Sequence, residues 1–163
     1  MKYAITGHTS GIGRRAFQRL DALGFSRSTG YDISNAEDRL RIVSEVQDCD
    51  VFINCAHAGF ASTYMLLDIY NAWQDLPNKT IINVGSRVAE IKLPRDRRDL
   101  LTYQAEKLAL KETVARINLL SPVCSVRYRW FAYVGTEKIL KKYPHFKQGD
   151  YITEDQAVDI ILS

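Results

Sequence analysis

Short apolar runs alternate along this chain with amphipathic stretches and glycine-containing turns. Continuous apolar runs occur within Lys2 to Thr6, Asp50 to Cys55 and Thr80 to Ser86, a pattern typical of buried parallel strands. Two further strands are predicted at about Phe25 to Ile33 and at Cys124 to Phe131. The stretches between them carry apolar residues at helical spacing, so the pattern predicts regular alternation of strand and helix.

Capping residues and glycines set the ends of the predicted helices. Polar N-caps with Asp, Asn, Ser or Thr and a closing glycine are the usual signals. The predicted helices run from the first glycine turn to Gly24, onward from an N-cap at Ser34 or Asn35, over Phe60 to Leu76, over Leu100 to Leu120, briefly within Lys138 to Lys147, and onward from an N-cap at Thr153, where Gln156 completes a capping box.

This alternation predicts an α/β fold, with residues 1–163 forming a single domain. Right-handed crossovers between successive strands favour a doubly wound, Rossmann-like parallel sheet of about five strands in the order 2-1-3-4-5. Ligands of such sheets bind beyond the carboxyl ends of the strands. Residues that follow the strands are therefore the candidates for chemistry.

Composition narrows the function classes further. A chain of 163 residues with 46% hydrophobic and 25% charged residues suits a globular domain, and a net charge of +3 does not indicate nucleic acid or a membrane surface as partner. The three cysteines, Cys49, Cys55 and Cys124, form no metal-binding pair and are expected to be reduced core thiols. With no signal peptide or long apolar span in the sequence, we expect a cytoplasmic protein.

The first strand leads into a glycine turn suited to binding phosphate. Gly7 permits the tight turn, Gly11 allows close approach of a pyrophosphate, and Gly13 allows close packing of helix on sheet. The following helix N-terminus presents free amides and partial positive charge to an anion. The alternative is that these glycines form only a structural turn between strand and helix and bind no ligand. The expected cofactor contacts within it are Gly7, Thr9, Ser10, Gly11, Ile12 and Gly13.

With Thr6 included, this stretch resembles the Thr-Gly-x-x-x-Gly-Ile-Gly motif of the short-chain dehydrogenase/reductase family. The sequence Tyr103-Gln104-Ala105-Glu106-Lys107 is similar to the family's Tyr-x-x-x-Lys, and Ser86 stands where the family has its catalytic serine. The resemblance implies Tyr103 as general acid/base, Lys107 as the group that lowers its pKa and binds the nicotinamide ribose, and Ser86 as the ligand of the substrate oxygen. An ammonium near a phenol stabilises phenolate, which makes this pairing chemically sensible.

The end of the second strand offers two candidates for the adenosine ribose. Asp32 lies at the distance from Gly13 expected of an NAD-type ribose ligand, whereas Arg27 would pair with the 2′-phosphate of NADP. The segment Asp32-Ile33-Ser34-Asn35 also resembles the family's adenine-contacting segment, which implies adenine contacts for Asp32 and Ile33. Both residues also allow a purely structural interpretation, in which Arg27 is a solvated loop residue and Asp32 caps the next helix.

Two further strand ends carry candidate residues. Asn54-Cys55-Ala56 resembles the start of the family's Asn-Asn-Ala-Gly motif, which implies cofactor contacts for Asn54 and Ala56. His57 is either a ligand of cofactor or substrate or an ordinary loop residue. After the fifth strand, Thr136 matches the family's nicotinamide-binding threonine, but Phe131-Ala132 replaces the usual Pro-Gly.

Together these residues predict an NAD(P)-dependent oxidoreductase that acts on a small carbonyl or alcohol substrate. NADP is the favoured cofactor because of Arg27, with NAD as the alternative. The resemblance also implies a homodimer, formed through the helix over Phe60 to Leu76 and the helix that carries Tyr103. The competing hypothesis is a non-catalytic or regulatory dinucleotide-binding module that acts through a dimer or a protein partner.

Overall fold

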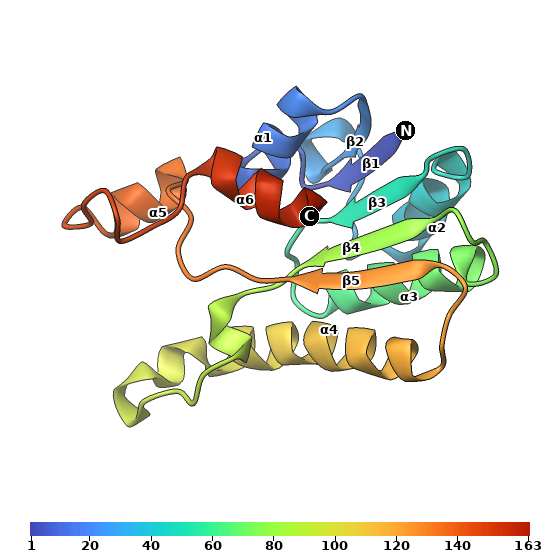
Figure 1. The fold of residues 1–163 in the computed structure, drawn as a ribbon. Coiled ribbons are helices and arrows are strands. Elements are labelled where there is room, and N and C mark those ends of the chain that lie inside the picture. The colour runs from blue at the N-terminus through green and yellow to red at the C-terminus, as the bar shows by residue number, and fades with distance from the viewer.

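The computed structural model describes residues 1–163, and its centre is a five-stranded parallel sheet (Figure 1). The strands are β1 (Tyr3–Thr6), β2 (Ala22–Phe25), β3 (Val51–Asn54), β4 (Thr80–Val84) and β5 (Ser125–Arg129). They lie in the order β2-β1-β3-β4-β5, and each neighbouring pair is parallel. The predicted fold class and strand order are confirmed.

Helices cover both faces of the sheet (Figure 1). They are α1 (Gly11–Arg19), α2 (Ala36–Glu45), α3 (Ala61–Trp73), α4 (Leu101–Leu119), α5 (Glu137–Lys142) and α6 (Glu154–Leu162). A cluster of 19 buried residues joins one face of the sheet to α2, α3 and α4, and a cluster of 11 joins the other face to α1 and α6. The sheet is thus buried on both sides, as parallel sheets normally are.

Strand β3 shows why the central apolar runs are continuous. All four of its residues are buried. Phe52 belongs to the larger hydrophobic cluster, whereas Val51 and Ile53 belong to the smaller one on the opposite face. Because successive side chains of a strand point to opposite faces, a strand covered on both sides needs apolar residues at successive positions.

The second strand lies earlier in the chain than the sequence predicted. Helix α1 ends at Arg19, β2 occupies Ala22–Phe25, and the predicted strand residues that follow form a short 3₁₀ turn at Arg27–Thr29 and a loop. Gly24 does not close a helix but pairs with Ile5 of β1. A Cβ on Gly24 would lie 2.5 Å from the ring of His8, so the glycine provides room for that ring.

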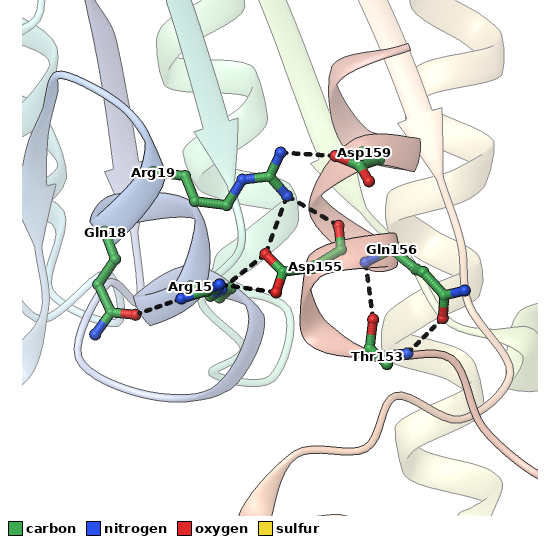
Figure 2. A network of polar contacts seen from close by, with 7 residues as sticks. All are labelled: Arg15, Gln18, Arg19, Thr153, Asp155, Gln156 and Asp159. Carbon is green, nitrogen blue, oxygen red and sulfur yellow. Dashed lines mark hydrogen bonds and ion pairs between the residues drawn. The ribbon is translucent and has the colours of Figure 1, made fainter. Parts of the chain in front are cut away.

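The predicted caps of two helices are confirmed. The Asn35 side chain accepts a hydrogen bond from the backbone N–H of Glu37 at the start of α2. Thr153 and Gln156 form the capping box of α6, with Gln156 N to Thr153 Oγ1 at 3.1 Å and Thr153 N to Gln156 Oε1 at 2.8 Å (Figure 2). These caps fix where each helix begins.

Figure 2 also shows the polar contacts that hold α6 against α1. Arg15 binds the Asp155 carboxylate through two nitrogens, at 2.8 and 2.7 Å, and Arg19 reaches both Asp155 and Asp159. Beneath these contacts, Ala157, Val158 and Ile161 of α6 are buried in the smaller cluster. None of the helices has the length and apolar character required to cross a lipid bilayer.

Candidate functional site

A cleft of about 620 Å³ runs along the carboxyl ends of the strands. It brings together residues from the glycine turn, the segment after β2, the segment after β3, helix α4 and the start of α5. Twelve of the residues singled out in the sequence line it: Gly7, Thr9, Ser10, Ile12, Gly13, Arg27, Asp32, Ile33, Ala56, Tyr103, Lys107 and Thr136. Gly11, Asn54 and Ser86 do not.

The glycine turn has the backbone geometry that its sequence predicts. Gly7 and Gly11 have positive φ angles of 74° and 51°, a region that side chains disfavour. A Cβ on Gly13 would lie 2.3 Å from the carbonyl oxygen of Gly7, so only glycine lets the helix begin so close to the strand. The Ser10 side chain makes no capping hydrogen bond to the first turn of α1. The amides at this helix end therefore face the cleft without a side-chain partner from the cap.

Thr6 fixes the glycine turn to the end of β3. Its buried hydroxyl oxygen accepts hydrogen bonds from the backbone N–H groups of Cys55 at 3.0 Å and Ala56 at 3.1 Å. Gly7 packs against the same segment, since a Cβ on Gly7 would lie 3.0 Å from the Cα of Ala56. The threonine of the motif thus sets the distance between two walls of the cleft.

The side-chain amide of Asn54 makes its hydrogen bonds within the protein. Its side chain is buried, and its amide donates to the carbonyl oxygen of Ser62 at 2.8 Å and to the side-chain oxygen of Asn83 at 3.0 Å. These bonds tie β3 to β4 and to the start of α3. The side chain therefore points into the sheet, and the sequence did not distinguish this position from one that faces a ligand.

Tyr103 and Lys107 lie one turn apart on α4 and line the cleft together. The Lys107 Nζ lies 5.9 Å from the centroid of the Tyr103 ring and donates a hydrogen bond to the carbonyl oxygen of Val84 at 3.2 Å. Lys107 is only 5% exposed, and burial lowers its pKa below the ordinary value, while nearby Cys55 and Glu106 act in the opposite direction. The Lys107 amine is thus held over the ring of Tyr103 inside the cleft.

Ser86 caps the turn that follows β4. Its hydroxyl oxygen accepts a hydrogen bond from the backbone N–H of Val88 at 3.3 Å. The preceding residue, Gly85, lies under the ring of Tyr128, because a Cβ on Gly85 would stand 2.1 Å from Cζ of that ring. Burial raises the pKa of Tyr128 to about 12, so this second phenol stays neutral at physiological pH.

The segment after β2 lines one part of the cleft with the two residues predicted to contact the adenosine ribose. Arg27 is exposed and makes no ion pair or side-chain hydrogen bond, and the hydroxyls of Ser26 and Ser28 beside it lie 2.9 Å apart. The Asp32 carboxylate accepts a hydrogen bond from the backbone N–H of Ser34 at 2.9 Å. Both Arg27 and Asp32 line the cleft, so the structure leaves both candidates in place.

Thr136 lies where the start of α5 meets the glycine turn. Its hydroxyl accepts from the backbone N–H of Ile139 at 3.3 Å and so caps α5. A Cβ on Gly11 would lie 3.3 Å from the Thr136 methyl group, and these two residues line a smaller adjoining pocket of about 370 Å³. Phe131, which replaces the proline of the family motif, is buried in the hydrophobic cluster on the α1 side.

Some residues of the cleft were not singled out from the sequence. Lys138 and Tyr31 both line it, and an exposed lysine or a loop tyrosine carries no sequence signal of such a position. His57, left open above, lines the cleft with its Nε2 atom 3.2 Å from a Glu106 carboxylate oxygen. Burial, with Lys107 and Lys138 nearby, lowers the pKa of His57 to about 4.

Comparison with known proteins gives likeness in structure alone. No protein-family model and no curated protein sequence matches this chain. It is similar to a short-chain dehydrogenase from Burkholderia cenocepacia in complex with NADP, at 21% identity, with 99% of this chain and 82% of that chain covered and a TM-score of 0.77.

Two further solved structures give the same picture. One is a 3-alpha-hydroxysteroid dehydrogenase from a Pseudomonas species complexed with NADH, at 18% identity, 99% and 88% coverage and a TM-score of 0.72. The other is a short-chain dehydrogenase from Sphingobium yanoikuyae in complex with NADPH, at 17% identity, 99% and 82% coverage and a TM-score of 0.73. The chain therefore has the fold of the short-chain dehydrogenases, as its motifs predicted.

Proposed function

We propose that this protein is an NAD(P)-dependent oxidoreductase of the short-chain dehydrogenase/reductase type, which acts on a small carbonyl or alcohol substrate. The observation that carries the proposal is the shared cleft: the glycine turn, Tyr103 and Lys107 come from distant parts of the chain and line one cavity. The NADP, NADH and NADPH complexes among the similar structures support the choice of cofactor.

The residues of the cleft fit a dinucleotide. A volume of about 620 Å³ lies within the range of small-molecule sites. The absence of a side chain at Gly13 leaves the space that the backbone of Gly7 occupies in the glycine turn. The amides at the start of α1 would hold the pyrophosphate, and Arg27 or Asp32 the adenosine ribose. Thr136 and Lys107 lie nearer the reacting end. When bound, the nicotinamide would supply or accept the hydride.

Tyr103 is proposed to move the proton that accompanies this transfer. In the reducing direction its hydroxyl donates the proton to the substrate oxygen, and the resulting phenolate is stabilised by the Lys107 ammonium. Lys107 donates to the Val84 carbonyl, and its remaining N–H groups are available to a ribose hydroxyl. Ser86 accepts from Val88 N–H, which leaves its own O–H free to donate to the substrate oxygen.

NADP is proposed as the preferred cofactor because Arg27 has no competing partner in the protein. A guanidinium binds phosphate through two nitrogens, so removal of Arg27 should weaken NADPH binding more than NADH binding. Fluorescence titration of wild type and Arg27→Ala with both cofactors measures this. We expect a loss of about tenfold or more for NADPH and little change for NADH. Equal losses, or a wild-type preference for NADH, would contradict the Arg27 assignment.

A screen of carbonyl compounds with NADPH, run beside Tyr103→Phe, tests the enzyme proposal. The phenylalanine ring keeps the packing of Tyr103 but removes the proton donor, so turnover should fall by about two orders of magnitude or more. NADPH binding should remain close to that of the wild type. Unchanged turnover in Tyr103→Phe would refute the catalytic assignment.

A dinucleotide-binding module without turnover is the second candidate. Two observations favour it: Ser86 does not line the cleft, and Phe131 is buried in the core where the family has proline. Tight NADPH binding with no oxidation by any carbonyl compound in the screen would support this function over the enzyme.

We also propose a cytoplasmic homodimer formed through α3 and α4. The inner side of α3 is fully buried through Met65, Leu66, Ile69 and Trp73, yet Tyr64 on the same helix is 53% exposed. Leu101 at the start of the neighbouring α4 is 61% exposed. Sedimentation of the wild type and Tyr64→Lys tests the dimer: the wild type should sediment as a dimer and the variant as a monomer.

A further inference from the structure

A polar contact links the segment after β3 to helix α4 inside the cleft. His57 Nε2 lies 3.2 Å from the Glu106 carboxylate, and Glu106 is the residue before Lys107. The Glu106 side chain is only 14% exposed, whereas that of His57 is 36% exposed and borders the cavity. The contact thus joins the segment after β3 to the helix that carries Tyr103.

The same imidazole packs on the ring of Tyr103. The two ring centroids are 5.0 Å apart, and the planes are nearly perpendicular, at 87°. Edge-to-face packing of this kind is a favourable and directional contact. His57 therefore restricts the orientation of the Tyr103 ring from one side, while Lys107 lies near it on the same helix.

The imidazole is neutral under physiological conditions, which determines what it can do. Lys107 and Lys138 face it together with the carboxylate of Glu106, and burial disfavours its charged form. The Nε2 atom lies 3.2 Å from a Glu106 carboxylate oxygen, so the neutral ring and the carboxylate are in polar contact. A neutral ring fixed in this way orients its neighbour and is a poor proton donor at neutral pH.

The backbone of this segment is also fixed from the cofactor side. The N–H of Ala56, the residue before His57, donates to the buried Thr6 hydroxyl at 3.1 Å. The first strand therefore holds the residue before His57, and the His57 side chain contacts α4.

We propose that His57, anchored by Glu106, is a positioning residue that sets the orientation of the Tyr103 phenol in the cleft. This inference rests on the proposed function, in which Tyr103 is the proton donor. It predicts that the two residues act as one unit. Loss of either contact should free the Tyr103 ring, and loss of both should cost no more than loss of one.

Steady-state kinetics of Glu106→Ala, His57→Ala and the double variant test this coupling. Each single change should lower kcat about tenfold, with KM and NADPH affinity within about twofold of wild type, and the double variant should also lose about tenfold. Glu106→Gln keeps the size and polarity of the side chain and should retain most of the activity. Glu112→Ala, an exposed position on the same helix, is the matched control and should behave as wild type. Multiplied losses in the double variant would overturn the proposal.

NMR of ring-labelled tyrosine reads the orientation without turnover, with the Tyr103 signal assigned from Tyr103→Phe. In His57→Ala and Glu106→Ala the Tyr103 ring resonances should shift and sharpen as the ring gains freedom, while Glu112→Ala leaves them in place. Unchanged Tyr103 resonances would overturn the positioning role, whether or not the protein oxidises NADPH. A shifted Tyr103 signal in a protein that turns over no carbonyl compound would refute the enzyme proposal and leave the contact itself supported.

Discussion

Lys107 places an ionisable amine in the buried interior, where a charge is costly to desolvate. The residue is 5% exposed, has one hydrogen bond to the Val84 carbonyl and titrates below its ordinary pKa because of burial. A buried cation with a single hydrogen bond is expected to destabilise the protein. Under the proposed function, stability and activity therefore conflict at this position.

Lys107→Met should accordingly melt at a higher temperature than the wild type while losing turnover. The folded-state pKa lies below that of the unfolded chain, so the cost is fully present below the folded value and disappears as pH rises to the unfolded one, near 10.4. Thermal melts at several pH values between 7 and 10 measure the difference. The difference in melting temperature between the variant and the wild type should become smaller toward pH 10. A wild type that melts at a higher temperature than Lys107→Met at pH 7 would contradict this prediction.

His57 should contribute to acid sensitivity. Its pKa of about 4 in the folded state lies below an unfolded value near 6.5, so the unfolded chain takes up a proton first as the pH falls. Stability should therefore decline between about pH 6.5 and 4 through this group. Urea titrations of wild type and His57→Gln measure the decline. The variant should lose less stability over this range, and parallel curves would refute the lowered pKa.

At the scale of elements, α6 is held to α1 by a buried contact layer and an outer layer of ion pairs. Ile161 is fully buried, so Ile161→Ala should lower the free energy of unfolding by about 2–5 kcal/mol. Asp155 contacts both Arg15 and Arg19 at the surface, where such pairs contribute little. Asp155→Asn should therefore lower the urea midpoint less than Ile161→Ala does. The reverse order would show that the ion pairs, and not the apolar layer, hold α6.

Sequence alone predicted elements best where the hydrophobic pattern was long or the caps were specific. The strand order and the caps at Asn35 and Thr153 were predicted because parallel strands and N-caps have strong local signatures. The second strand was misplaced because Gly24 reads as a helix end, although its role is to accommodate the His8 ring. That contact depends on tertiary packing, which no local pattern encodes.

The site was predicted in the same uneven way. Backbone requirements, such as the glycines at positions 7 and 13, follow from chain geometry and are readable in sequence. Side-chain direction is not readable in sequence: the Asn54 amide bonds to Ser62 and Asn83, which no local pattern showed, and its cofactor contact stays a prediction. The partner of His57 was also beyond prediction, because Glu106 lies 49 positions away along the chain.

At the scale of the whole molecule, the fold brings two halves of the cleft to a single edge of the sheet. The first strand and α1 flank the glycine turn, and α4 carries Tyr103 and Lys107. The order β2-β1-β3-β4-β5 places β3 between these halves. The segment after β3, which carries Ala56 and His57, thus contacts both, through Thr6 on one side and Glu106 on the other.

Transfer of deuterium from labelled NADPH to the substrate shows directly whether the protein catalyses hydride transfer. NADPH carrying deuterium at both positions of the nicotinamide C4 is incubated with the wild type and the best carbonyl substrate from the screen, and the alcohol is analysed by mass spectrometry. We predict deuterium on the carbinol carbon with the wild type, and about a hundredfold slower labelling with Tyr103→Phe. Alcohol formed without deuterium, or labelling at the same rate in Tyr103→Phe, would contradict the account.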